Sequence, residues 1–88
     1  MANLQDMEKF KTLLDEEYDW PVDYLFKFIL PIGQRELFIN SLGIEGHIER
    51  PSKTGKYISI TFHKNVTSSD DVLFVYEQAS QVKGVMSL

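Results

Sequence analysis

Cysteine is absent from the 88-residue sequence. Its absence excludes a disulfide framework, a thiolate zinc site, an iron–sulfur cluster and a cysteine nucleophile. Basic residues are also scarce, since 9 Lys and Arg stand against 13 Asp and Glu and give a net charge of −4. Affinity for phosphate backbones comes from an excess of Lys and Arg, so we do not expect nucleic-acid binding to be the main activity.

Long apolar runs are missing as well. The longest, such as residues 72–76, are far shorter than the roughly 20 residues of a membrane-spanning helix. The first residues lack the basic and apolar regions of a secretory signal peptide. We therefore expect a cytoplasmic protein that is not bound to a membrane.

The acidic charge is concentrated at one end of the chain. Residues 1–23 hold seven acidic and two basic residues, a net charge of −5, so residues 24–88 carry a net charge of +1. A chain of this length forms a single domain around one two-layer core. We expect residues 1–88 to be one domain, in which an acidic helix within residues 1–19 is appended to a core of residues 20–88 that folds without it.

The appended segment has the apolar spacing of an amphipathic helix over residues 4–17. This helix is expected to end before Trp20-Pro21, because the residue that precedes a proline is disfavoured in the α conformation. The residues expected on its apolar face are Met7, Phe10, Leu13 and Leu14.

Two further segments show helical spacing. The first covers residues 34–42, with Gly33 as its N-cap and Gly43 directly after its end. The second begins at the capping sequence of residues 68–71, whose acids suit the positive end of the helix dipole, and ends at Gly84. The residues expected to be buried by the two helices are Leu37, Phe38 and Leu42, and Val72, Val75 or Tyr76, Ala79 and Val82.

Four segments have the pattern of β-strands. Residues 24–30 are a dense apolar run with one charge, which is typical of a central strand. Residues 46–51 end in a proline, which favours an edge strand, and a glycine-containing loop then leads into residues 57–66. In the latter, Ile58, Ile60 and Phe62 point to one side, while Ser59, Thr61 and His63 point to the other. Residues 85–88 form a short last strand.

The order after residue 23 is therefore β-α-β-β-α-β. With right-handed crossovers on one sheet, this order gives an α+β, ferredoxin-like fold with a four-stranded antiparallel sheet. Both helices then cover one face of the sheet, and the first and third strands lie at its centre. The other face stays open.

Three blocks of sequence resemble a known family. They are Trp-Pro-Val-Asp-Tyr-Leu-Phe-Lys-Phe at residues 20–28, Pro-Ser-Lys-Thr-Gly-Lys-Tyr-Ile-Ser-Ile-Thr at residues 51–61, and Val-Tyr-Glu at residues 75–77 together with Val-Met-Ser-Leu at residues 85–88. They are similar to blocks of the YbeD-like family of small bacterial proteins, a domain of unknown function. The resemblance implies a ferredoxin-like fold similar to that of ACT regulatory domains, and it brings no established activity.

The alternation of the two central strands places a polar cluster on the open face. Leu25, Lys27 and Ile29 face that side, next to Ser59, Thr61 and His63. A lysine beside two hydroxyls and an imidazole would suit a small anion or a carboxylate. The alternative is a lysine that lies along a half-solvated sheet with its ammonium in water.

Two loops are further candidates. The turn Pro31-Ile32-Gly33 resembles the strand–helix turn at which ACT domains hold amino acids, and N–H groups at a helix N-terminus suit a carboxylate. The same proline and glycine are what any turn of this kind requires. The basic hairpin of Arg50, Lys53 and Lys56, with Lys64 nearby, either keeps an edge strand soluble or meets the acidic helix of a second copy.

The two histidines give the only metal hypothesis. If residues 53–56 form the hairpin turn, His47 lies opposite Phe62. A slip of one residue would bring it opposite His63, where the two histidines and Glu49 could hold a metal. Solvated histidines on strands are the alternative.

No nucleophile–base pair or acid in an apolar setting is evident, so we expect neither an enzyme nor a cofactor. The sequence leaves two functions open. One is a regulatory or binding module whose contacts with a protein partner or a second copy use Leu25, Ile29, Tyr57, Arg50, Lys53 and Lys56. The other is an ACT-like sensor of an amino acid or carboxylate that uses Lys27, Pro31, Ile32, Gly33, Ser59, Thr61 and His63.

Overall fold

The structure, a computed structural model, describes residues 4–88. After an N-terminal helix, the elements follow the order β-α-β-β-α-β that the sequence predicts, with one 3₁₀ turn between the first strand and its helix. The elements are α1 (Leu4–Glu17), β1 (Val22–Pro31), η1 (Ile32–Gln34), α2 (Arg35–Leu42), β2 (Ile48–Pro51), β3 (Tyr57–Val66), α3 (Ser69–Ser80) and β4 (Met86–Ser87).

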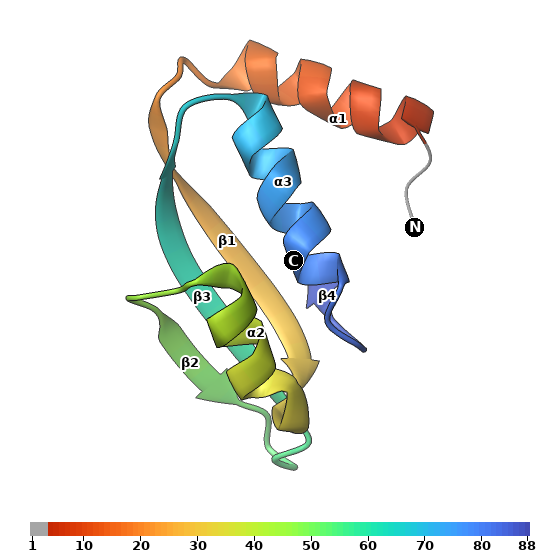
Figure 1. Ribbon diagram of the computed structural model, residues 1–88, viewed down its shortest axis with the longest axis vertical. Coiled ribbons are helices and arrows are strands. Elements are labelled where there is room, and N and C mark those ends of the chain that lie inside the picture. Colours follow the sequence, from red (N-terminus) through yellow and green to blue (C-terminus); the bar gives the residue numbers. More distant parts are fainter. Residues whose placement is uncertain (1–3) are drawn as a thin grey trace.

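The four strands form one antiparallel sheet in the order β2-β3-β1-β4, so β1 and β3 lie at its centre as predicted. The long central pair runs in register from Val22 opposite Val66 to Pro31 opposite Tyr57. Helices α2 and α3 lie on one face of the sheet, and α1 crosses the end of α3 on the same side (Figure 1). The α+β, ferredoxin-like fold is confirmed.

The core forms where the alternating side chains of the central strands meet the helices. Phe26 and Phe28 of β1 and Phe62 of β3 are buried, and their ring centroids lie 5.3 to 6.3 Å apart. Residues at the same alternation phase continue this layer along both strands, since Leu30 and Ile60 are fully buried. Each aromatic ring buries a large apolar area, so this cluster contributes much of the stability of the fold.

Helix α1 has the predicted bounds, but it buries a narrower stripe than predicted. Leu14 is 4% exposed and belongs to the core, while Phe10 is half-buried with its ring 5.7 Å from that of Tyr76 on α3. Met7 and Leu13 are exposed. The stripe is narrow because only the side of α1 that faces α3 and the sheet is covered.

Helix α2 differs from the prediction at its start. Gly33 is not its N-cap, because residues 32–34 form the 3₁₀ turn and Gln34 caps the helix. Gly43 follows its end with φ of 62°, as predicted. Leu37 is 54% exposed rather than buried, since it lies about 100° around the helix from the buried Phe38.

Helix α3 begins as predicted, with the Ser68 hydroxyl accepting a hydrogen bond from the Asp71 N–H. It ends at Ser80, however, and not at Gly84. Val82 is buried in the turn that follows, and Gly84 has φ of 79°, where an added Cβ would lie 2.8 Å from the Pro31 Cγ. Long-range packing, which a helical pattern does not reveal, therefore sets the end of this helix.

Candidate functional site

The face of the sheet away from the helices is uncovered within residues 4–88 and carries exposed apolar side chains. Strand pairing places Ile48 of β2 opposite Thr61, and Met86 of β4 opposite Ile29, all on this face. The Leu88 N–H continues the ladder by donating to the Lys27 carbonyl at 2.9 Å. The apolar residues that are 45% to 66% exposed on this open face are Leu25, Ile48, Tyr57 and Met86.

The predicted polar cluster lies at the centre of the open face. Lys27 is directly opposite Thr61, and the neighbouring pairs are Ile29 with Ser59 and Leu25 with His63. The Ser59 hydroxyl donates to the Arg50 carbonyl at 3.3 Å. No ion pair or side-chain hydrogen bond within residues 4–88 is recorded for the Lys27, Thr61 or His63 side chains. The structure thus brings these residues together on an exposed surface, where solvent screens the lysine charge.

The predicted turn and the basic hairpin meet at one end of the sheet. Pro31 lies opposite Tyr57, and the Ile32 N–H donates to the Lys56 carbonyl at 2.9 Å. Ile32 and Gly33 are exposed, as are the basic residues of the hairpin, Arg50, Lys53 and Lys56. This end of the open face is therefore positively charged.

The other end of the open face is acidic. Asp23 lies on this face opposite Asn65, and it is exposed. The connection from α1 adds Asp19, also exposed, close in sequence to the start of β1. Because eight residues separate Asp23 from Pro31 along β1, the two charged ends are about 27 Å apart.

The two histidines lie on opposite faces of the sheet, so the metal hypothesis for His47, Glu49 and His63 is wrong. The observed register of β2 and β3 is the unslipped one, which directs Glu49 toward the helices. No cluster of three or more His, Asp or Glu in the described part of the chain is arranged to hold a metal ion.

His47 and Glu49 instead form a charged cluster with Arg35 of α2, which sequence reasoning missed. The Arg35 guanidinium donates two hydrogen bonds to the Glu49 carboxylate, the one from Nη2 at 2.6 Å, and His47 Nε2 lies 2.9 Å from Glu49 Oε2. These bonds, with that of Arg35 first, lower the pKa of Glu49 to about 2. His47 Nδ1 is buried and has no hydrogen-bond partner within residues 4–88. The cluster joins the start of α2 to the edge strand β2.

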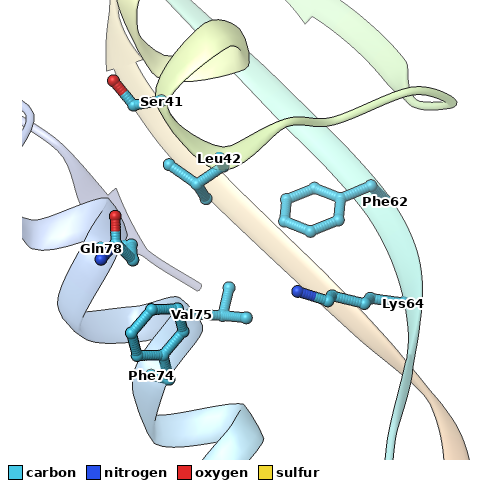
Figure 2. A pocket seen from close by; sticks show the side chains of 7 residues that line it. All are labelled: Ser41, Leu42, Phe62, Lys64, Phe74, Val75 and Gln78. Carbon is cyan, nitrogen blue, oxygen red and sulfur yellow. The ribbon is translucent and has the colours of Figure 1, made fainter.

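A small pocket lies between α2, α3 and β3 on the helix side of the sheet (Figure 2). Its volume is about 240 Å³. Lys64 extends its ammonium into this space, at an alternation phase otherwise occupied by the buried Phe62 and Val66. The prediction that Lys64 lies near the basic hairpin is therefore wrong, since Lys64 pairs with Tyr24 toward the other end of β3. A charge at an inward-facing position of β3 was the signal that could have identified it. The other lining residues are Ser41, Leu42, Phe74, Val75 and Gln78.

A larger apolar groove, of about 710 Å³, follows α1, α3 and β4. Phe10 and Tyr76 form part of its wall, and burial is the main cause that raises the pKa of the Tyr76 hydroxyl. Within residues 4–88, no helix has both the length and the apolar character needed to cross a bilayer.

The family described as a protein of unknown function (DUF493) matches residues 15–88. The YbeD-like resemblance is confirmed, because YbeD belongs to the same family. No curated protein and no solved structure matches the chain. The match spans all but the first 14 residues, and the chain belongs to the DUF493 family.

Proposed function

We propose that this protein is a cytoplasmic binding module that acts through protein–protein contacts at the open face of its sheet, and that the open face docks a second copy of the chain. The observation that carries the proposal is the set of four exposed apolar side chains on a face that no described element covers. Exposed apolar side chains gathered on one uncovered face of a small domain are a mark of an interaction site. No catalytic step is part of the proposal.

The charges at the two ends of the open face favour a second copy as the occupant. Asp23 lies at one end, and Arg50 and the hairpin lysines lie at the other. If two open faces pack about a two-fold axis that runs across the strands, the acidic end of each copy meets the basic end of the other. Lys27 then lies near the middle, where its long stem packs against apolar neighbours while its ammonium reaches solvent.

Light scattering during size-exclusion chromatography, combined with sedimentation equilibrium, tests the proposal. We expect the protein to form a dimer, and Leu25→Asp to raise the dimer dissociation constant by about 100-fold, because it places an unpaired charge in the interface. Leu13→Asp is the matched control, since Leu13 is equally exposed (56% against 53%) but lies on α1. A protein that stays monomeric at high concentration, or a dimer that Leu25→Asp leaves intact, would contradict the proposal.

A charge exchange tests the orientation of the two copies. Asp23→Arg and Arg50→Glu should each weaken the dimer by up to about fivefold, as expected of exposed ion pairs. The double variant restores the complementary charges and should recover the affinity of the original chain. If the double variant is weaker than both single variants, the two faces do not pack in this orientation.

A second candidate function is the sensing of a small carboxylate. The observation that favours it is the Lys64 pocket, because it is a concave site with one cation. The Pro31–Gly33 turn and the Lys27 cluster stay predictions of the sequence. Both are exposed, and neither lines one of the two hollows described above.

A further inference from the structure

We propose that the Lys64 pocket, the space between α2, α3 and β3 shown in Figure 2, binds a small monocarboxylate with a short apolar chain. The Lys64 ammonium pairs with the carboxylate, and the chain lies on the apolar floor of the pocket.

The Lys64 side chain is exposed, and its ammonium points into the pocket from an inward-facing position of β3. Its neighbours in the same alternation phase of β3, Phe62 and Val66, are 6% and 0% exposed. No hydrogen bond or ion pair of the Lys64 side chain is recorded within residues 4–88. The pKa of Asp71 is lowered first by the hydrogen bonds that Oδ2 accepts from the Thr67 hydroxyl and N–H, at 2.6 and 2.8 Å, and only then by the charge of Lys64. An anion in the pocket would supply the missing partner.

The walls of the pocket fit an amphipathic ligand. Leu42, Phe62 and Val75 form an apolar floor, and the exposed ring of Phe74 stands beside it. Ser41 and Gln78 add a hydroxyl and a carboxamide. Neither side chain makes a hydrogen bond within the described residues. Ligand sites commonly combine an apolar lining with a few such polar groups.

Size and charge narrow the ligand class. The volume of about 240 Å³ lies just below the range of roughly 300 to 1,000 Å³ that drug-sized ligands occupy, so the ligand must be small. No acidic side chain lines the pocket, so the ammonium of an amino acid would have no carboxylate to pair with. The last turn of α2, with Ser41 and Leu42, carries the negative end of the helix dipole. The carboxylate is therefore expected on the Lys64 side and the apolar chain toward Leu42.

Titration of the ¹⁵N-labelled protein with hexanoate, followed by amide chemical shifts, tests the proposal. We expect shifts concentrated at Ser41, Phe74 and Gln78, with a dissociation constant on the order of 1 mM for a ligand of this size. Hexylamine and hexanol have the same chain without the carboxylate. Each should bind at least about tenfold more weakly.

Three variants test whether the Lys64 ammonium binds the carboxylate. Lys64→Gln should weaken hexanoate binding by about tenfold, and Lys64→Arg should retain most of it. Lys83→Gln, an exposed lysine in the turn after α3, is the matched control and should have no effect. The amide spectrum of each variant reports whether it is folded. If Lys64→Gln is not folded, Lys64→Arg still tests the proposal.

Several results would overturn the proposal. They are the absence of localised shifts up to about 50 mM hexanoate, equal binding of hexylamine, and unchanged binding by Lys64→Gln. Shifts centred on Lys27 would also overturn it and would place the anion on the open face. The dimer measurement of the proposed function does not involve this pocket, so the two proposals fail separately.

Discussion

Leu14→Ala is the substitution that measures how firmly α1 belongs to the domain. Leu14 is 4% exposed and contacts the hydrophobic core, although it lies in the segment that the sequence suggests is appended. Further contacts hold α1 in place, since Lys11 donates to the Ser69 hydroxyl at 2.9 Å and pairs with Asp70 at 3.0 Å. The exposed ion pair contributes little, so the packing of Leu14 and Phe10 carries most of the docking energy.

The expected magnitude follows from burial and cavity formation. Burial of a leucine side chain contributes about 1.5–3 kcal/mol, and leucine-to-alanine changes in cores cost about 2–5 kcal/mol once the cavity is included. We expect a value near the lower end, about 2–3 kcal/mol, because the helix can settle onto the sheet. In a domain of this size, that corresponds to a decrease of roughly 10–20 °C in Tm. The total stability is about 4–13 kcal/mol, so the variant should still fold.

Urea unfolding followed by circular dichroism gives the free energy of unfolding directly. Leu13→Ala is the matched control, since it makes the same chemical change one residue away at a side chain that is 56% exposed, and it should cost less than about 0.5 kcal/mol. A Leu14→Ala effect on the free energy of unfolding as small as that of Leu13→Ala would refute the docked position of α1. Deletion of residues 1–17 then tests whether the core folds alone, as the sequence suggests.

Two further predictions concern pH and backbone conformation. Because the pKa of Glu49 falls from 4.5 to about 2 on folding, chiefly through Arg35, the stability that Glu49 contributes is fully present above pH 4.5 and is lost as the pH falls toward 2. The difference in urea midpoint between the original chain and Glu49→Gln should therefore be constant near neutral pH and shrink between pH 4.5 and 2; a difference that persists at pH 2 would contradict this. Gly84→Ala should cost at least about 1–2 kcal/mol in thermal unfolding, because Gly84 has φ of 79° and an added Cβ would lie 2.8 Å from the Pro31 Cγ. Gly46→Ala meets no atom within 4 Å and should be nearly neutral, so equal effects of the two would rule out this explanation.

Most of the fold could be predicted because it depends on local patterns. The alternation of residues 57–66 determines which side of β3 is buried, and the hairpin length determines its register with β2. The ends of the helices were less predictable. Helix α2 has only eight residues, so its apolar stripe is too short to distinguish Leu37 from Ile39. Helix α3 ends where the chain must pack Val82 and pass Pro31, which no local pattern encodes.

The candidate sites were likewise predictable only where they depend on local patterns. The open-face residues Lys27, Ser59, Thr61 and His63 lie together as predicted, since strand alternation alone brings them to one side. The Lys64 pocket depends on where two helices lie above the sheet, so periodicity could indicate only that Lys64 points inward. The bonds of Arg35 to Glu49 join elements 14 residues apart and depend on the same placement.

The short length of β4 has a consequence for the local stability of the sheet. By strand order β1 is central, yet β4 pairs only with Phe28 and Ile29, and Leu88 adds one bond to Lys27. The first half of β1 is therefore held by hydrogen bonds to β3 on one side alone. Backbone opening should be easiest there, and the sheet should fray from the end that starts at Val22. Helix α1 is joined to that end. Its side-chain packing therefore stabilises the part of the sheet that has the fewest backbone hydrogen bonds.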